Sequence, residues 1–278
     1  MSYGTTILLG AIAGLTIFLG LPVARLPRRP LRLQGFLNAL ATGILIFLLW
    51  DVLSKANEPV RRALEAVHKG DLATFAVILV IFIGGLASGL LSLIYFNRAM
   101  ANRFRNADAR ALRGPGAAVA VKTVGLASSG SLALMIAIGL GLHNFSEGLA
   151  IGQAAATGAI AFATVLIVGF GLHNVTEGFG IAAPMASDSQ RPSWSFLGMV
   201  GLIGGGPTFL GTIVGYSFTS VYVFVLFLTL AAGALIYVIN EMFNVGRRMS
   251  GPVALGWGLI LGFAVGYGTD LFLTYAGA

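Results

Sequence analysis

Long uninterrupted apolar segments are the feature that most limits how this chain can fold. A helix needs about 20 apolar residues to cross the hydrocarbon core of a bilayer. Eight segments reach that length, and they are continuously apolar, whereas membrane β-strands alternate apolar and polar residues. They are residues 5–24, 35–53, 73–96, 126–153, 158–184, 194–219, 221–244 and 253–276. We therefore predict an all-α fold: a polytopic transmembrane helical bundle that forms one domain over residues 1–278.

The composition excludes several classes of protein. Hydrophobic residues make up 57% of the chain and charged residues 10%, whereas a soluble domain carries about 25% charged residues. No soluble catalytic domain is expected, and we predict that the protein is not an enzyme. Cysteine is absent, which excludes disulfides, thiolate metal sites and cysteine nucleophiles. The net charge is +7, and we expect the basic residues to interact with anionic lipid headgroups rather than with nucleic acid.

The distribution of basic residues predicts the orientation. Most of the 17 Lys and Arg residues lie in the loops after the first, third, fifth and seventh segments. The remaining ones, Lys55, Arg61, Arg62 and Lys69, lie after the second segment. Cytoplasmic loops carry the excess of positive charge, so we expect both termini on the outer side of a plasma or bacterial inner membrane.

Two segments are predicted to lie outside the bilayer. Residues 97–122 are basic and rich in Ala and Gly, which predicts a cytoplasmic loop. Residues 57–70 predict a separate short amphipathic helix on the outer side, capped by Asn57 and with Pro59 in its first turn.

Ionisable residues inside a span are costly, and by default they indicate function. The fourth segment contains His143 followed four residues later by Glu147, and the fifth contains His173 followed by Glu177. The pattern H-N-x-[S/T]-E-G thus occurs twice on consecutive helices. A short connection makes those helices antiparallel neighbours, so the two motifs are expected to face each other.

The spacing of the motif indicates its chemistry. Residues i and i+4 share one helix face, so each His projects beside its Glu, and the following Asn can flank the same space. Two imidazoles, two carboxylates and two amides form a nitrogen and oxygen ligand set that suits a divalent cation of the zinc type. The predicted metal ligands are His143, Asn144, Glu147, His173, Asn174 and Glu177. A buried hydrogen-bonded helix clamp is the alternative, and a metalloprotease is disfavoured because H-E-x-x-H is absent.

Two further acidic residues are predicted along an ion pathway. Asp51, near the outer end of the second segment, either receives the ion or marks the membrane interface. Glu241, near the inner end of the seventh, either lies on a release path or pairs with Arg247 or Arg248.

The two motifs resemble those of the ZIP (Zrt/Irt-like) family of metal transporters, in its prokaryotic form. The segment His143–Gly148 matches the family's fourth-span signature, and His173, Asn174 and Glu177 match its fifth span. Ala231–Ala234 with Tyr237 and Glu241 resembles the seventh span, and Gly206–Gly211 the sixth. The sequence departs from the family at Ser146 and Thr176, where many members have proline, and at Gly206, where some prokaryotic members have a glutamate of a second metal site.

The resemblance implies transport of a divalent metal ion into the cytoplasm, with zinc first and iron, manganese, cobalt and cadmium as alternatives. The metal is cargo, and no prosthetic group is expected. A homodimer is left open, as is the choice between a carrier and a channel-like route. The alternatives from other classes are a proton-linked carrier of small organic solutes, with the His–Glu pairs as proton relays, and a membrane scaffold that transports nothing.

Overall fold

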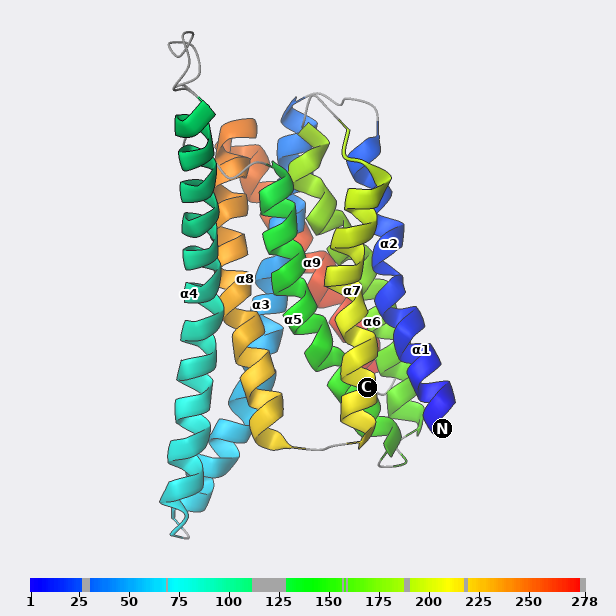
Figure 1. The fold of residues 1–278 in the computed structure, drawn as a ribbon. Helices are drawn as coiled ribbons and strands as arrows, with labels where there is room; N and C mark the ends of the chain where they lie inside the picture. The colour runs from blue at the N-terminus through cyan, green and yellow to red at the C-terminus, as the bar shows by residue number, and fades with distance from the viewer. Residues whose placement is uncertain are drawn as a thin grey trace.

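The structure is a computed structural model that describes residues 1–26, 31–68, 70–111, 129–156, 158, 160–187, 191–217 and 220–275. This part of the chain is a helical bundle with no β-strand, which confirms the predicted all-α fold (Figure 1). The helices are α1 (Tyr3–Leu15), α2 (Ile17–Gly20), α3 (Leu31–Val67), α4 (Leu72–Ala111), α5 (Ser129–Ala156), α6 (Ile160–Ala182), α7 (Trp194–Ser217), α8 (Val221–Met249) and α9 (Pro252–Tyr275). Two 3₁₀ segments, Leu21–Arg25 and Ala183–Ser187, follow α2 and α6.

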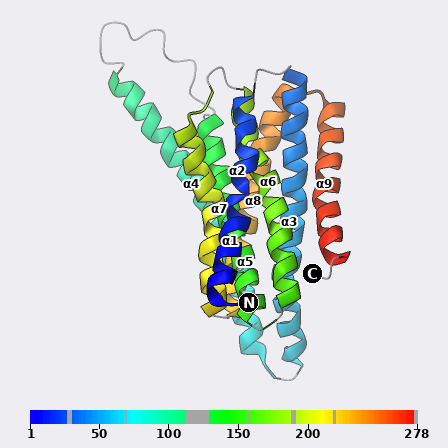
Figure 2. The same cartoon turned by 90° about the vertical axis from the view of Figure 1, so that its right-hand side faces the viewer.

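Seven helical segments of the described chain are long and apolar enough to cross a bilayer, as expected of a multi-pass membrane protein. They comprise α1 together with α2 and its 3₁₀ extension, and then α3, α4, α5, α7, α8 and α9. The fifth predicted span corresponds to α6, which is not among these seven, so the count of eight stays a prediction. The start of α1 and the last turn of α9 lie toward the same end of the bundle (Figure 2).

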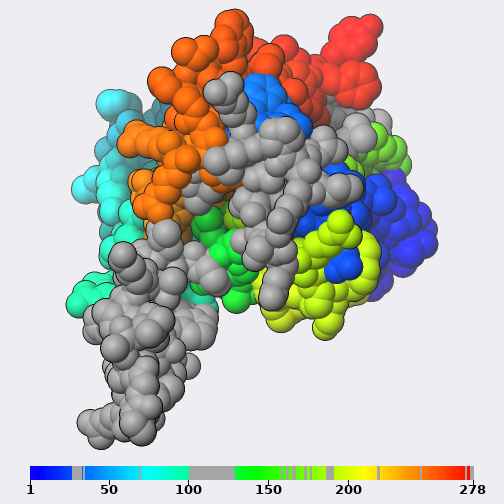
Figure 3. Space-filling view, turned by 90° about the horizontal axis from the view of Figure 1, so that it is seen from above, coloured from blue at the N-terminus to red at the C-terminus, as the bar shows by residue number. Residues whose placement is uncertain are grey.

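Helix α5 lies at the centre of the bundle and packs against α6, α7 and α8. Helix α3 packs against α8 and α9, and α4 packs mainly against α8. Figure 2 shows α4 and α9 at opposite edges, and Figure 3 shows α4, α8 and α7 from the end opposite the termini. The outer face of α4 leaves apolar side chains exposed, with Val80 at 70%, as expected of a helix that faces lipid.

The second span and the predicted amphipathic helix form one continuous helix, so the prediction of a separate element is wrong. Helix α3 runs without interruption from Leu31 to Val67, with Pro59 inside it. A proline removes one backbone hydrogen bond, and here the remaining bonds of a 37-residue helix maintain the helix across it. Lys55 therefore lies on a helix that belongs to the bundle and not in a loop.

The third span also continues beyond its predicted end. Helix α4 extends to Ala111, so residues 97–111 of the predicted cytoplasmic loop are helical. This stretch is rich in Ala and Arg, which are strong helix formers, and it contains neither Gly nor Pro. Residues 112–122 of the predicted loop lie outside the described residues.

Glycines allow α5 to pack closely against α7, and α6 against α2. A Cβ added at Gly148 would collide with the backbone carbonyl of Thr208, and one added at Gly178 with the carbonyl of Ile17. The two motif glycines therefore permit close helix approach. The motif faces of α5 and α6 are in this way held against the first and sixth spans.

Candidate functional site

The motif residues of α5 and α6 lie in the interior, where the two helices contact each other. Helix α5 contributes His143, Asn144 and Glu147, and α6 contributes Asn174 and Glu177. All five are buried, and none is more than 6% exposed. The structure thus brings together five of the six predicted ligands, while the side chain of His173 lies outside the described residues.

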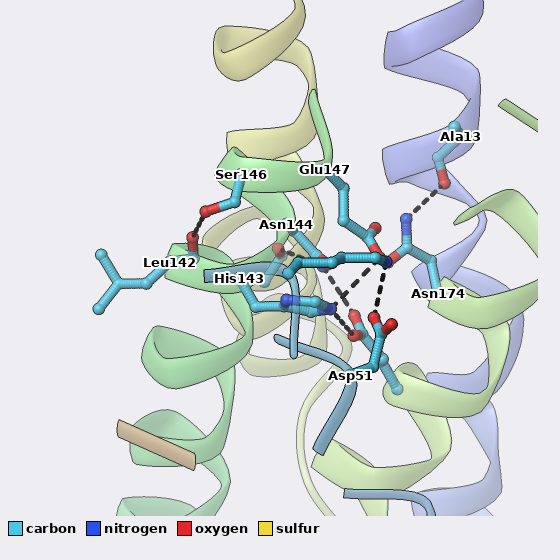
Figure 4. A network of polar contacts seen from close by, with 11 residues as sticks. Ala13, Asp51, Leu142, His143, Asn144, Ser146, Glu147 and Asn174 are labelled. Atoms are coloured by element: carbon cyan, nitrogen blue, oxygen red, sulfur yellow. Dashed lines mark hydrogen bonds and ion pairs between the residues drawn. The ribbon is translucent and has the colours of Figure 1, made fainter. Parts of the chain in front are cut away.

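One imidazole lies between two carboxylates. Nε2 of His143 is 3.2 Å from Oε1 of Glu147 on its own helix and 3.9 Å from Oε1 of Glu177 on α6. The first contact confirms that residues i and i+4 of the motif share a face, and the second that the two motifs face each other. Figure 4 shows His143, Asn144, Glu147 and Asn174 converging. Two buried carboxylates this close to one nitrogen repel each other unless a positive charge compensates them.

Asn144 connects three helices through its amide nitrogen. Nδ2 donates to Oε2 of Glu177 at 2.7 Å and to the backbone carbonyl of Gly204 on α7 at 3.0 Å. Both amide hydrogens are thereby used. These two partners fix which end of the Asn144 amide is the nitrogen, because a carboxylate and a carbonyl oxygen accept hydrogen bonds and need a donor opposite them.

Asn174 is fixed by a break in the first span. Its Nδ2 donates to the carbonyl of Ala13 at 2.9 Å, just before the turn at Thr16 that separates α1 from α2. The Thr16 hydroxyl lies 2.7 Å from the same carbonyl and 2.5 Å from the carbonyl of Gly171 on α6. A flipped Asn174 amide would place two oxygens against each other, so its Oδ1 must point away from Ala13.

Three buried oxygens in this cluster accept no hydrogen bond from the described part of the chain. They are Oδ1 of Asn144, Oδ1 of Asn174 and Oε2 of Glu147. A buried acceptor without a donor costs about 1–3 kcal/mol, so three in one place need a compensating group. Because all three are acceptors, a cation can satisfy them at the same time.

The Ser146 side chain of the α5 motif bonds back to its own helix. The Ser146 hydroxyl donates to the carbonyl of Leu142, four residues earlier, at 3.4 Å (Figure 4). Its hydroxyl is therefore directed at the α5 backbone and not at the ligand set.

The two predicted pathway residues have different surroundings. Asp51, which is labelled in Figure 4, lies beside the cluster and borders a small cavity that Glu147 also lines. Glu241 lines a separate groove of about 540 Å³ between α4 and α8, together with Arg98 and Tyr237. The structure therefore brings Asp51 to the cluster but does not bring Glu241 there.

Sequence reasoning missed the neighbours that complete the cluster. The carbonyls of Ala13 and Gly204 carry no sequence signal, because every residue has a carbonyl. Lys55 did have a signal, since it follows Asp51 by four residues, and its Nζ lies 2.7 Å from Oδ2 of that residue. Asp270 of α9 borders the cavity that Glu147 also lines.

Among the described residues, no three His, Asp or Glu side chains are arranged so that they could hold a metal ion together. The ring of His173 is outside that set. The predicted ligand set also includes the amide oxygens of Asn144 and Asn174, and asparagine is not one of these residue types.

Comparison with known protein families and with curated proteins finds no match to this chain. The resemblance to ZIP transporters therefore rests on the quoted motif residues alone. What the cluster can do follows from its geometry and charge.

Proposed function

We propose that the chain is a membrane carrier that moves a divalent transition-metal ion, zinc in the first place, into the cytoplasm. The proposed ligands come from α5 and α6: His143, Asn144, Glu147, His173, Asn174 and Glu177. The observation that carries the proposal is the set of three buried acceptor oxygens, on Asn144, Asn174 and Glu147, that receive no hydrogen bond from any residue the structure describes. A hydrogen-bonded helix clamp would be expected to pair these oxygens instead.

The charge of the cluster supports a divalent ion. Glu147 and Glu177 both lie beside His143 and together bring a charge of −2 when ionised. An ion of charge +2 compensates both carboxylates, whereas a monovalent ion leaves one buried charge uncompensated at a cost of several kcal/mol.

The donor types support a transition metal. Imidazole suits zinc, copper, iron and nickel, whereas magnesium and calcium prefer sites made of oxygen alone. Zinc accepts mixed nitrogen and oxygen ligands without a redox requirement. Iron, manganese, cobalt and cadmium are the alternatives to test.

The size of the adjoining cavity favours an ion over an organic solute. The cavity next to Glu147 has a volume of about 30 Å³, whereas sites for small organic molecules span about 300–1,000 Å³. The larger groove between α4 and α8 is lined by none of the cluster residues. A proton-linked solute carrier is therefore the second candidate, supported only by the His143–Glu147 contact.

The proposed route runs from Asp51 at the outer side, through the cluster, to the end of the bundle that carries Arg247 and Arg248. Glu241, near that end of α8, is retained as a proposed release residue. Secondary transporters commonly bind their cargo near the bilayer midplane and expose it alternately by movement of helix groups. Multi-pass insertion in the plasma or bacterial inner membrane completes the proposal.

The decisive experiment measures metal content and uptake on the same preparation. Purified protein in detergent is incubated with zinc, desalted and analysed by mass spectrometry, and the same protein in liposomes is assayed for uptake with a fluorescent zinc indicator. We expect bound zinc and saturable uptake. Absence of bound metal, together with solute-driven proton flux, would favour the second candidate.

A further inference from the structure

Lys55 is a positive charge next to the cluster that the proposed function leaves unexplained. Its ammonium donates to Oδ2 of Asp51 at 2.7 Å and lies 5.8 Å from the centre of the Phe170 ring on α6. An aromatic face attracts a cation at this range. The side chain is thus drawn from α3 toward α6, next to the candidate site.

A small cavity connects Lys55 with the cluster. It has a volume of about 30 Å³ and is lined by Asp51, Lys55, Glu147 and Asp270, among others, and it has room for about one or two water-sized particles. The Lys55 side chain is 46% exposed, whereas Glu147 is 6% exposed. A particle that comes from the surface therefore meets Lys55 before it meets Glu147.

The carboxylates that surround the Lys55 ammonium would attract a metal cation as well. Asp51, Glu147 and Asp270 all act on Lys55 electrostatically. A divalent ion on its way to the cluster is attracted by the same carboxylates, and it is repelled by the ammonium that they hold. The two cations repel each other and compete for the same carboxylates, so each one weakens the binding of the other in this cavity.

A second ion pair on α3, between Arg62 and Glu58, is a solvent-exposed pair with which Lys55–Asp51 can be compared. Arg62 and Glu58 are also four residues apart and in contact, but their side chains are 76% and 62% exposed. Such a pair contributes little beyond local helix stability. Lys55 differs because it also approaches a ring on α6 and borders the cavity that Glu147 lines.

We propose that the Lys55 ammonium is a tethered cation at the outer mouth of the cluster, which an incoming divalent ion must displace before it reaches Glu147. The proposal rests on the proposed function, since it requires a metal ion as cargo. Lys55 weakens metal binding by competition, because the ion gives up part of its attraction to Asp51 and Asp270 to move the ammonium aside. The tether returns the ammonium to the cavity once the ion has moved inward.

The first test is zinc affinity, measured by calorimetric titration of the full-length protein in detergent. Lys55→Met removes the charge and keeps much of the side-chain length, and we expect its Kd to fall about tenfold. Lys55→Arg keeps the charge, and Arg62→Met removes a charge from the exposed pair of the same helix. Both should stay within about twofold of the unchanged protein. An unchanged Kd in Lys55→Met, or an equal fall in Arg62→Met, overturns the proposal.

The second test needs no metal. Thr269 borders the same cavity, and Thr269→Cys introduces a single thiol into a chain without cysteine. Its labelling rates by a cationic and an anionic methanethiosulfonate report the local charge. Adding Lys55→Met should raise the ratio of cationic to anionic labelling about tenfold, and adding Arg62→Met should leave it unchanged. An unchanged ratio in the Lys55 variant overturns the proposal even if zinc binds.

The two tests separate this proposal from the proposed function. Zinc binding with equal Kd in all variants removes the role of Lys55 and leaves the carrier intact. Absence of zinc binding in every variant removes the carrier and, with it, the displacement step. A shifted labelling ratio with an unchanged Kd shows a charged mouth that the ion does not need to clear, and this also overturns the proposal.

Discussion

Replacement of either buried glutamate by glutamine separates a metal site from a hydrogen-bonded helix clamp. Glu147→Gln and Glu177→Gln keep the size of the side chain and remove one negative charge. At Glu177 the introduced amide oxygen can still accept the hydrogen bond that Asn144 donates at 2.7 Å. A clamp should therefore tolerate either change, whereas a site that holds a divalent ion should not.

The expected loss follows from the burial of the cluster. Both carboxylates lie within 4 Å of the same imidazole nitrogen and are almost inaccessible, so water screens them poorly. Removal of one partner from a buried ionic contact costs about 3–5 kcal/mol. Zinc affinity should fall by roughly 100-fold to a few thousand-fold in each single variant. The double variant should lose less than the two losses combined, because both glutamates act on one ion.

The assay pairs zinc uptake with thermal unfolding of the metal-free protein. Apo stability should hold or rise in both variants, since two repelling carboxylates become one. Glu58→Gln is the matched control, because Glu58 is an exposed acid on α3, and its uptake should stay unchanged. Near-normal uptake in both cluster variants, or loss of folding in either, would refute the assignment of these residues as the metal site.

Three further predictions concern topology, proton competition and packing. Ser2→Cys and Ala278→Cys should both be labelled by an impermeant thiol reagent added outside intact cells; protection of both sites would contradict the predicted orientation. Zinc binding should weaken as the pH falls from about 8 to about 5, because ligating imidazoles must be neutral and protons compete with the ion; a flat titration would argue against histidine ligands. Gly178→Ala should lower apo stability by about 1–3 kcal/mol, because its Cβ would collide with a carbonyl of α2. Gly180→Ala, where the Cβ meets open space, should be neutral or slightly stabilising in the same thermal unfolding assay.

Local sequence signals predicted the elements but not where two of them end. The segments 35–53 and 57–70 differ in polarity, and Pro59 supported a boundary between them. The structure continues α3 through that proline, because hydrogen bonds on both sides keep a long helix intact. Residues 97–111 were predicted as a loop from their charge, yet charge alone does not end a helix when Ala and Arg predominate.

The sequence by itself determined the helical class, the pairing of each motif His with its Glu, and the expectation that the two motifs face each other. These conclusions depend on the bilayer thickness, on the 3.6-residue helical period and on the short connection between the fourth and fifth spans, all of which are local properties of the sequence. Only the tertiary structure decided the orientation of the cluster's oxygens, because the Ala13 and Gly204 carbonyls that fix the two asparagines come from other helices. It also decided that Lys55 borders the cluster, since the ring and the carboxylates around its ammonium lie on α6, α5 and α9. These contacts with helices that are distant in the chain depend on packing across the bundle, and no local pattern in the sequence encodes them.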